Sequence, residues 1–595
     1  MKQFIKFTIA TVCGIALFIT LSGLFFIVSM IGVIAADSAK TSVKDNSVFV
    51  LQLSGQVTER AEEDSPLAMI MGQANMEQMG LDDIIASIKK AKEQDDIKGI
   101  YLEGGAVSFD TPATAQQIRD ALKDFKQSGK WIVAYSDQYL QAGYYVASVA
   151  DKVYLNKTGM LDFKGLGGKS EYMKGLYDKI GVKYQVAKVG KYKSYVERNT
   201  QTGMSEYDRE QRTAYLQGIW QHWLKDIADS RKVSAAQLDQ LANDSIIALA
   251  DAKDYVKAKL VDKLMYPEEL KTVIKERLGL DKDDDINQLT LSDMKGIEPK
   301  QKEKGDKIAV YYAYGEIIDQ MASPFVSDHS IVGKQTVDDL NKLASDDDVK
   351  AVVLRVNSGG GSAVASEQIW HAVKQLKTKK PVVVSMGGAA ASGGYMISAA
   401  ADYIIAEPTT ITGSIGIFGL IPNFSELVTD KLGVTFDGVK TNTYTDFEDN
   451  LVLGKDNAEE MKYMQSYVNR GYINFLDIVA NGRKMKREAV DEIAQGRVWL
   501  AKDALGIKLV DKLGSLDDAV KKAAELAKVS EYHAATYPAP ASWIEQFMPS
   551  EKKGTYLDSE LRALLGNMYE PVMELQREQS RNRLQARLPY SMNVK

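Results

Sequence analysis

A serine lies between glycines in the stretch ITGSIGIFG, residues 411–419, where Ser414 interrupts an otherwise apolar run. A free serine is a weak nucleophile and needs an adjacent base to take its proton. Histidine is the usual base, but none of the four histidines lies in a glycine-rich or loop signature. A lysine can serve instead when burial lowers its pKa, because desolvation disfavours the charged form. The segment VGKYKSYVE (189–197) supplies Lys191 and Lys193, although taken alone it is typical of a solvated basic loop.

The segment RVNSGGGSAVASE (355–367) has the composition of an oxyanion-binding loop. It follows a predicted buried strand and precedes a predicted helix, and its glycines allow the backbone to approach a ligand closely. Consecutive amides in such a loop can point at a developing oxyanion, but similar loops also bind phosphate. A second run of glycine and alanine, MGGAAASGGYMIS (386–398), either shapes the floor of a pocket or simply packs closely.

The chain repeats itself at a nearly constant offset of 252, 251 and 249 residues. The matching pairs are DDIKGIYLE (95–103) with DDVKAVVLR (347–355), ASVADKVYL (147–155) with SAAADYIIA (398–406), and AKDYVKAKLVDKL (252–264) with AKDALGIKLVDKL (501–513). Self-similarity at a fixed spacing indicates a structural unit that occurs more than once. The sequence therefore predicts a tandem duplication.

Each copy alternates short β-rich segments with amphipathic helical segments, which predicts parallel strands and an α/β fold. Between the copies, residues 281–306 are charged and poorly periodic, as is typical of a linker. We therefore expect repeats over residues 46–280 and 307–535. The remaining residues, 536–595, include a helical pattern over 557–588 and are expected to form a helical extension used for packing or assembly.

Each copy holds one candidate catalytic group that the other copy lacks. In the register of the repeat, Phe163 is opposite Ser414, and Lys193 is opposite Thr445. Structural residues tend to recur in both copies of a duplication, whereas one-sided groups suggest a division of labour. We therefore expect a single site to which both repeats contribute.

Length and composition indicate a globular protein with more than one domain. At 595 residues the chain is too long for one core. Its content of 45% hydrophobic and 26% charged residues is that of a globular protein, and a net charge of -6 gives no reason to expect nucleic-acid binding. The single cysteine, Cys13, excludes an intrachain disulfide framework.

The N-terminus predicts a membrane anchor over residues 1–45. Thirty uncharged residues run from Phe7 to Ala36, and about 20 suffice to span a bilayer, whereas the apolar part of a cleaved signal is about 7–15 residues long. Positive charges are balanced on the two sides of this run, so the charge count does not orient it. Because long downstream domains translocate regardless of small charge biases, we expect a cytoplasmic N-terminus with the repeats outside.

The apolar N-terminus, the tandem repeat, the YKS segment, the glycine loop and the ASGGY and TGSIGIFG runs together resemble the signal peptide peptidase A (protease IV) family in its long double-domain form. The resemblance covers about residues 1–535. It implies tandem crotonase-like, Clp-protease-like α/β repeats, a Ser/Lys dyad formed between them, and no metal or organic cofactor. It also implies cleavage of signal peptides and other extended peptides, a bacterial inner-membrane location with periplasmic catalytic domains, and a homo-oligomer, commonly a tetramer.

Carried over residue by residue, the resemblance assigns Ser414 as the nucleophile and Lys193 as the general base. The backbone amides of Gly360 and Ser414 are then the oxyanion donors. One departure from the family is visible, since Gly359 stands where a proline is usual, and glycine presets the backbone less than proline does. Lys191 competes with Lys193, and the YKS match favours Lys193.

Two other classes of function stay open at this point. A crotonase-like fold with a glycine oxyanion loop also suits an acyl-CoA or thioester enzyme, although the carboxylates of such enzymes have no clear counterpart here. An inactive membrane scaffold is the other alternative, because a sequence does not show whether Ser414 and Lys193 meet.

Overall fold

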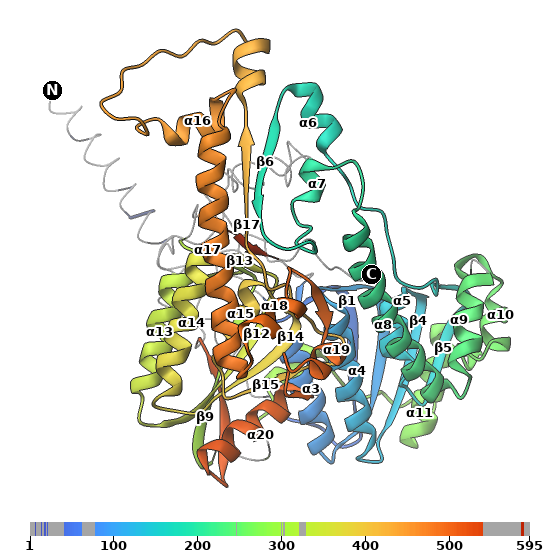
Figure 1. Cartoon of the computed structure of the whole chain (residues 1–595). Helices are drawn as coiled ribbons and strands as arrows, with labels where there is room; N and C mark the ends of the chain where they lie inside the picture. The colour runs from blue at the N-terminus through green and yellow to red at the C-terminus, as the bar shows by residue number, and fades with distance from the viewer. Residues whose placement is uncertain are drawn as a thin grey trace.

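The computed structural model describes residues 41–61, 78–244, 247–298, 300, 304–320, 329–538 and 585–587, together with isolated residues before residue 41. Two α/β bodies lie side by side, one blue to green and the other yellow to red (Figure 1). A narrower projection rises above them and contains strands and helices from both (Figure 1). The duplication seen in the sequence is therefore a duplication of architecture.

The first repeat is built on a parallel sheet of seven described strands in the order β2–β1–β3–β4–β5–β7, with β8 paired to β1. Its strands are β1 (Ser47–Thr58), β2 (Gln78–Gly80), β3 (Ile97–Phe109), β4 (Trp131–Tyr139), β5 (Lys152–Leu161), β7 (Lys263–Leu264) and β8 (Gln288–Leu289). Its helices are α3 (Leu81–Glu93), α4 (Pro112–Lys126), α5 (Gln141–Ala147), α6 (Lys174–Ile180), α7 (Glu197–Thr200), α8 (Glu206–Arg231), α9 (Ala235–Asp244), α10 (Ala252–Lys257), α11 (Pro267–Leu278) and α12 (Leu291–Lys295), with a 3₁₀ turn η1 (Ile247–Leu249).

The second repeat is built on eight described strands in the order β18–β16–β14–β12–β9–β20, with β15 beside β14 and β19 beside β15. Its strands are β9 (Asp306–Tyr314), β12 (Val349–Ser358), β14 (Val382–Ala391), β15 (Tyr403–Ala406), β16 (Ile411–Gly413), β18 (Val498–Leu500), β19 (Lys512–Leu513) and β20 (Tyr532–Tyr537). Its helices are α13 (Gly333–Ser345), α14 (Ala363–Lys377), α15 (Gly393–Ser398), α16 (Phe447–Leu453), α17 (Ala458–Arg483), α18 (Arg487–Ile493), α19 (Ala501–Gly506) and α20 (Leu516–Ala527), with a π-helical turn η2 (Glu426–Lys431).

The two copies repeat one another's internal hydrogen bonds. The Tyr144 hydroxyl donates to the Leu260 carbonyl at 2.7 Å, and the Tyr395 hydroxyl donates to the Leu509 carbonyl at 2.9 Å. Both tyrosines are fully buried, where a hydroxyl without a partner would be costly. The predicted α/β fold, built twice in tandem, is confirmed by this correspondence and by the two sheets.

A third sheet joins the repeats, in the order β11–β10–β13–β21–β17–β6. Its strands are β6 (Lys183–Lys188), β10 (Glu316–Ile318), β11 (Ser330–Val332), β13 (Gly360–Ser362), β17 (Phe418–Asn423) and β21 (Gln585–Arg587). Strand β6 comes from the first repeat and pairs antiparallel with β17 of the second. Strand β21, from near the end of the chain, lies between β13 and β17 and is antiparallel to both.

Three expectations about segments outside the repeats need comment. The charged segment 281–306 contains β8 and α12, and Met294 and Ile297 are buried in the first core, so its charge pattern does not mark a free linker. The predicted helix over 557–588 is wrong at residues 585–587, which form β21; its other residues lie outside those described. The predicted transmembrane segment at about 7–36 also lies almost wholly outside them, and no helix in the described part of the chain is long and apolar enough to cross a membrane.

A buried ion pair fixes the repeats against each other at their lower contact. The Arg355 guanidinium on β12 donates to Glu59, which follows β1, at 2.6 Å, and also to Gln117 on α4 at 2.8 Å. The Arg355 and Glu59 side chains are only 1% and 3% exposed. Asn357 donates to the same carboxylate at 3.0 Å. Each charge is thus matched by partners from the other repeat.

Replacing Glu59 with alanine should lower the free energy of unfolding by about 3–5 kcal/mol, because the Arg355 charge would remain buried without its carboxylate. Urea unfolding followed by tryptophan fluorescence measures this change. Asp229→Ala, which removes the solvent-exposed partner of Lys225, is the control and should change stability little. Equal effects of the two substitutions would contradict the role given to the buried pair.

Candidate active site

Lys193 lies in the loop between β6 and α7 and is 1% exposed. The loop of the first repeat packs on the segment 494–497 of the second, where the Tyr192 amide donates to the Gln495 carbonyl at 2.9 Å. Gly496, with φ +76°, leaves the necessary room, since a Cβ atom there would come within 2.7 Å of the Lys193 backbone nitrogen. The lysine is therefore enclosed by residues of the opposite repeat.

The amino group of Lys193 meets two serines of the second repeat. Its Nζ atom lies 2.7 Å from Ser392 Oγ, 3.0 Å from Ser414 Oγ and 2.9 Å from the Ser414 carbonyl oxygen. Burial holds the pKa of the Lys193 amino group well below its usual value of 10.5. The neutral amine, which is the form that can accept a proton, is therefore the form that this site favours.

A neutral amine has two N–H donors and one lone pair, and the three oxygen contacts match that capacity. The Ser414 carbonyl can only accept, so one N–H points to it. A hydroxyl group can donate or accept. The second N–H of the amine then donates to one of the two serine hydroxyls, and the other hydroxyl donates to the nitrogen lone pair. The hydroxyl that donates to the lone pair is the one that can lose its proton to Lys193.

Ser392 occupies a sharp turn between β14 and α15. Its backbone has φ 56° and ψ −116°, a conformation rare for a residue with a side chain and one that costs about 1–3 kcal/mol. Its side chain makes no hydrogen bond to the start of α15 and instead points to Lys193. A strained turn from strand to helix is also the setting that exposes the nucleophile in α/β hydrolases.

Ser414 also has a positive φ, of 51°, and the amides of both serines are bound to backbone carbonyls, that of Ser392 to Gly413 at 2.8 Å. The Ser414 amide donates to the Arg497 carbonyl at 2.7 Å. The Ser414 N–H, which the sequence predicts as an oxyanion donor, is therefore already hydrogen-bonded within the protein. The Ser414 hydroxyl and carbonyl both contact the lysine instead.

Gly360, the other predicted oxyanion residue, has φ +98° and begins β13. Its amide donates to Ser358 Oγ at 3.1 Å. A Cβ atom at this position would collide with the Ala586 carbonyl oxygen of β21 and would lie 2.7 Å from the Gly393 amide nitrogen. The Ala586 carbonyl oxygen thus lies beside Gly360 and beside Gly393, the residue that follows Ser392.

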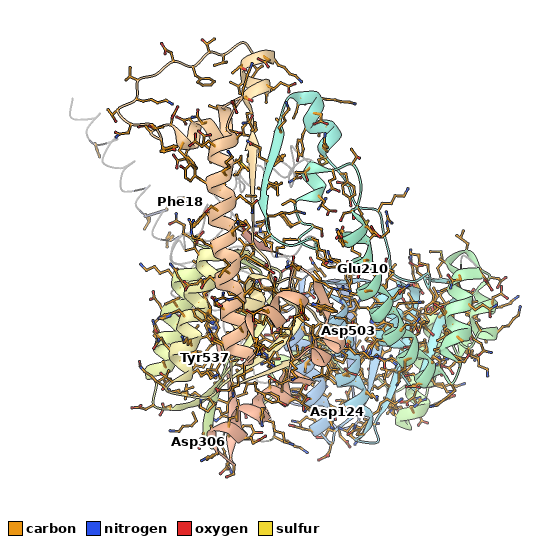
Figure 2. The ribbon with its side chains drawn as sticks, in the orientation of Figure 1. Phe18, Asp124, Glu210, Asp306, Asp503 and Tyr537 are labelled. Carbon is orange, nitrogen blue, oxygen red and sulfur yellow. The ribbon has the colours of Figure 1, made fainter. Side chains whose placement is uncertain are left out.

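A polar network surrounds the lysine loop. Glu210 on α8, labelled in Figure 2, accepts the Tyr192 hydroxyl at 2.9 Å and pairs with Arg497 at 3.0 Å. The Arg497 carbonyl in turn accepts the Ser414 amide. The neighbour of Lys193 and the partner of Ser414 are therefore held by the same acidic side chain.

The other basic candidates face away from these serines. Lys191 is exposed, and its amino group lies 5.0 Å from the centre of the Tyr207 ring. His222 lies 3.5 Å from Asp226 on α8, and the His329 ring lies 4.4 Å from that of Tyr314. Within the described ranges no group of three or more histidine, cysteine or acidic residues is arranged to hold a metal ion.

Sequence reasoning singled out Ser414 and missed Ser392, although the repeat carried a signal for it. At the offset of 251 residues, Ser392 is opposite Gln141, so it is as one-sided as Ser414. In the first repeat the side-chain Oε1 atom of Gln141 accepts from the backbone amides of Lys164 and Gly165 at 2.7 and 2.9 Å. The glycine and alanine residues around Ser392 made close packing an equally good interpretation.

Two protein-family models match the chain. The model of peptidase family S49 matches residues 124–281 and 374–530, and the Clp protease model matches residues 324–410. The chain belongs to peptidase family S49. The two S49 matches fall in the two repeats, and the Clp protease match includes the glycine loop, so the predicted relation to Clp protease subunits is confirmed at the level of fold.

Family S49 relatives are similar over most of the chain. Protease 4 of Salmonella typhi is 36% identical over 514 residues, covering 84% of this chain and 82% of its own. Protease 4 of Haemophilus influenzae is 35% identical, covering 88% and 87%, and the chloroplastic serine protease SPPA of Arabidopsis thaliana is 28% identical, covering 82% and 70%. The S49 chain described here is thus a serine peptidase, as predicted, and the acyl-CoA and scaffold alternatives lose their support.

The pH dependence of stability should report the buried amine of Lys193. Between the folded pKa and 10.5 the unfolded chain binds one more proton than the folded chain, so this group makes stability rise with pH. Relative to Lys193→Met, wild-type protein should gain about 1.4 kcal/mol per pH unit in that interval. The gain should end near pH 10.5 and should shrink as pH falls through the folded pKa.

Urea unfolding of both proteins at a series of pH values measures the difference, in which other titrating groups cancel. Lys191→Met, at an exposed position in the same loop, should run parallel to wild type. If Lys193→Met also runs parallel to wild type, Lys193 carries its ordinary charge in the folded protein.

Proposed function

We propose that this serine peptidase is an endopeptidase that uses Ser392 as nucleophile and Lys193 as general base. The observation that carries the proposal is the buried Lys193 Nζ atom 2.7 Å from Ser392 Oγ, across the contact between the repeats. A base within hydrogen-bond reach of a hydroxyl, with its pKa lowered toward neutrality, is the arrangement that acyl transfer requires.

In this mechanism Lys193 takes the Ser392 proton as Oγ attacks the peptide carbonyl. The ammonium ion then gives that proton to the leaving amine, and the neutral lysine activates a water molecule that hydrolyses the acyl-enzyme. We propose that Gly360 and Gly393 border the oxyanion site, because the Ala586 carbonyl lies between them. Ser414 positions the base, since both its carbonyl and its hydroxyl contact the amine.

Ser414 is the second candidate for the nucleophile, because its hydroxyl is also within 3.0 Å of the amine. Three observations favour Ser392 over it. Ser392 is closer to the amine, it lies on the strained turn, and it precedes Gly393, which borders the carbonyl of the bound strand. The predicted role of Ser414 thus becomes one of positioning in this proposal.

We propose that the substrates are extended peptides, including the signal peptides that the family resemblance implies. Strand β21 supports extended binding, because it lies between β13 and β17 and pairs antiparallel with both. The space that β21 fills between these two strands is called the cleft. Main-chain pairing of this kind accepts many side chains and requires an unfolded segment.

Replacing Ser392 with alanine should abolish peptide hydrolysis, with a loss of about 10⁴-fold or more in kcat. Ser414→Ala should keep the nucleophile but loosen the base, at a loss of about 10²-fold. Hydrolysis of a fluorogenic peptide gives the rates, and mass spectrometry after fluorophosphonate treatment gives the modified residue, which should be Ser392 in wild type and in Ser414→Ala.

Gly360→Ala serves as a companion variant, since its added methyl should obstruct the cleft and slow fluorophosphonate labelling of Ser392. Thr429→Ala, on the distant π-helical turn, is the matched control and should label at the wild-type rate. An adduct on Ser414 in wild-type protein would restore the sequence-based assignment.

We further propose that residues 7–36 anchor the chain in the bacterial inner membrane, with the repeats on the periplasmic side and as part of a homo-oligomer, by resemblance a tetramer. The support is the uncharged run of the N-terminus, which is long enough to span a bilayer.

Deletion of residues 1–45 should release an active protein from the membrane fraction, because both Lys193 and Ser392 lie outside the deleted segment. Carbonate extraction of membranes followed by a peptidase assay measures this, and light scattering gives the mass of the released particle. Retention of the shortened chain in the membrane would show that the N-terminus is not the anchor.

A further inference from the structure

The cleft beside Ser392 is filled by a segment of the chain itself. In β21, Arg587 pairs with Gly360, Ala586 with Gly361, and Gln585 with Ser362. On the other side, Gln585 pairs with Phe418 of β17. All three residues of β21 are buried, with Ala586 fully so. The segment therefore occupies the cleft as a peptide substrate would, and its contacts show what the cleft can recognise.

The position of the Ala586 carbonyl sets the register of this internal ligand. Its oxygen lies beside Gly360 and Gly393, where the carbonyl attacked by Ser392 would lie. The residue that follows a reacting carbonyl carries the leaving amine. Arg587 follows Ala586, so its side chain occupies the subsite on the leaving-group side of the scissile bond.

The guanidinium group of Arg587 contacts residues of both repeats. The Arg587 side chain is 9% exposed and forms an ion pair with the carboxylate of Glu316 on β10. It also donates to the Tyr195 hydroxyl at 2.8 Å, and its guanidinium carbon lies 5.5 Å from the centre of the Tyr195 ring. The Tyr195 ring is itself stacked on Phe418 at 5.1 Å. A carboxylate, a hydroxyl and an aromatic face together suit arginine better than a neutral side chain.

The two recognition residues come from different repeats. Tyr195 lies two residues after Lys193 in the loop of the first repeat, and Glu316 begins β10 of the second. The contact that assembles the dyad therefore also assembles this subsite. Transferring an arginine side chain from water to a buried position is costly unless an opposite charge accompanies it. The Glu316 carboxylate supplies that opposite charge.

We propose that Glu316 and Tyr195 form a specificity subsite that selects arginine immediately after the scissile bond, and that Arg587 is its resident occupant. The inference rests on the proposed function, since it takes its register from attack at the Ala586 position. The segment 585–587 then competes with other peptides for the cleft. A peptide with arginine directly after the scissile bond displaces this segment best.

The test uses the full-length protein carrying Arg587→Ala, which weakens the internal competitor and leaves the subsite intact. The probes are a fluorescent nonapeptide with the sequence of residues 582–590, NRLQARLPY, and its twin with glutamine in place of the second arginine. Fluorescence anisotropy gives the affinity of each peptide, and mass spectrometry of the products gives kcat/KM and the bond cleaved. The arginine peptide should bind about tenfold more tightly.

Adding Glu316→Gln should bring the ratio of the two affinities close to one, because a neutral amide cannot match the guanidinium charge. Tyr195→Phe keeps the ring and loses the hydroxyl, so the ratio should fall to an intermediate value; this second variant protects the test if Glu316→Gln fails to fold. Glu426→Gln, which removes a carboxylate of the projection beside Lys183, is the matched control and should leave the ratio unchanged.

Equal affinities for the two peptides, or an unchanged ratio in both Glu316→Gln and Tyr195→Phe, would overturn the subsite. The outcome is separable from that of the proposed function. Selective binding of the arginine peptide without cleavage by any variant would leave the subsite standing and overturn the catalytic proposal. Cleavage of both peptides at equal kcat/KM and with equal affinity would support the catalytic proposal and overturn the subsite.

Discussion

The burial of one amino group is the constraint on which this site depends. A charged ammonium without a carboxylate partner is expensive inside a protein, so enclosing Lys193 favours the neutral amine, and the enclosure itself produces a base. Gly496 makes the enclosure possible, and the oxygens of Ser392 and Ser414 satisfy the amine without adding charge. A carboxylate in their place would raise the pKa of the lysine and remove its ability to accept a proton.

Because the amine and the serines come from different repeats, the contact between repeats is part of the chemistry. The pairing of β6 with β17 fixes the upper side of this contact, and Glu59 with Arg355 fixes the lower side. A displacement of about 1 Å between the bodies would lengthen the contact from Lys193 to Ser392 beyond proton-transfer range. In the proposed mechanism, the cohesion of the repeats therefore serves catalysis as well as stability.

Much of this arrangement could be predicted from the sequence because duplication provides an internal comparison. The α/β repeats follow from periodicity, and a site shared by the two repeats follows from one-sided residues, whereas the choice of Lys193 over Lys191 came from the resemblance of the YKS segment to the family. Ser392 was missed because its significance lies in a strained backbone turn, and glycine and alanine neighbours are equally typical of close packing. The engagement of the Ser414 amide and the docking of 585–587 depend on contacts between residues distant in sequence, which no local pattern records.

The first repeat has Gln141 at the position that corresponds to Ser392, and this difference between the repeats has an evolutionary consequence. Gln141 and Phe163 occupy in the first repeat the positions that Ser392 and Ser414 occupy in the second, and Gln141 lines a cavity of about 810 Å³. A fold built twice offers two equivalent positions for such a site, and in the described residues Lys193 contacts the serines of the second repeat. The residues around Gln141 do not have to support proton transfer, so their sequence can change toward another role. The residues around Ser392 do not have this freedom.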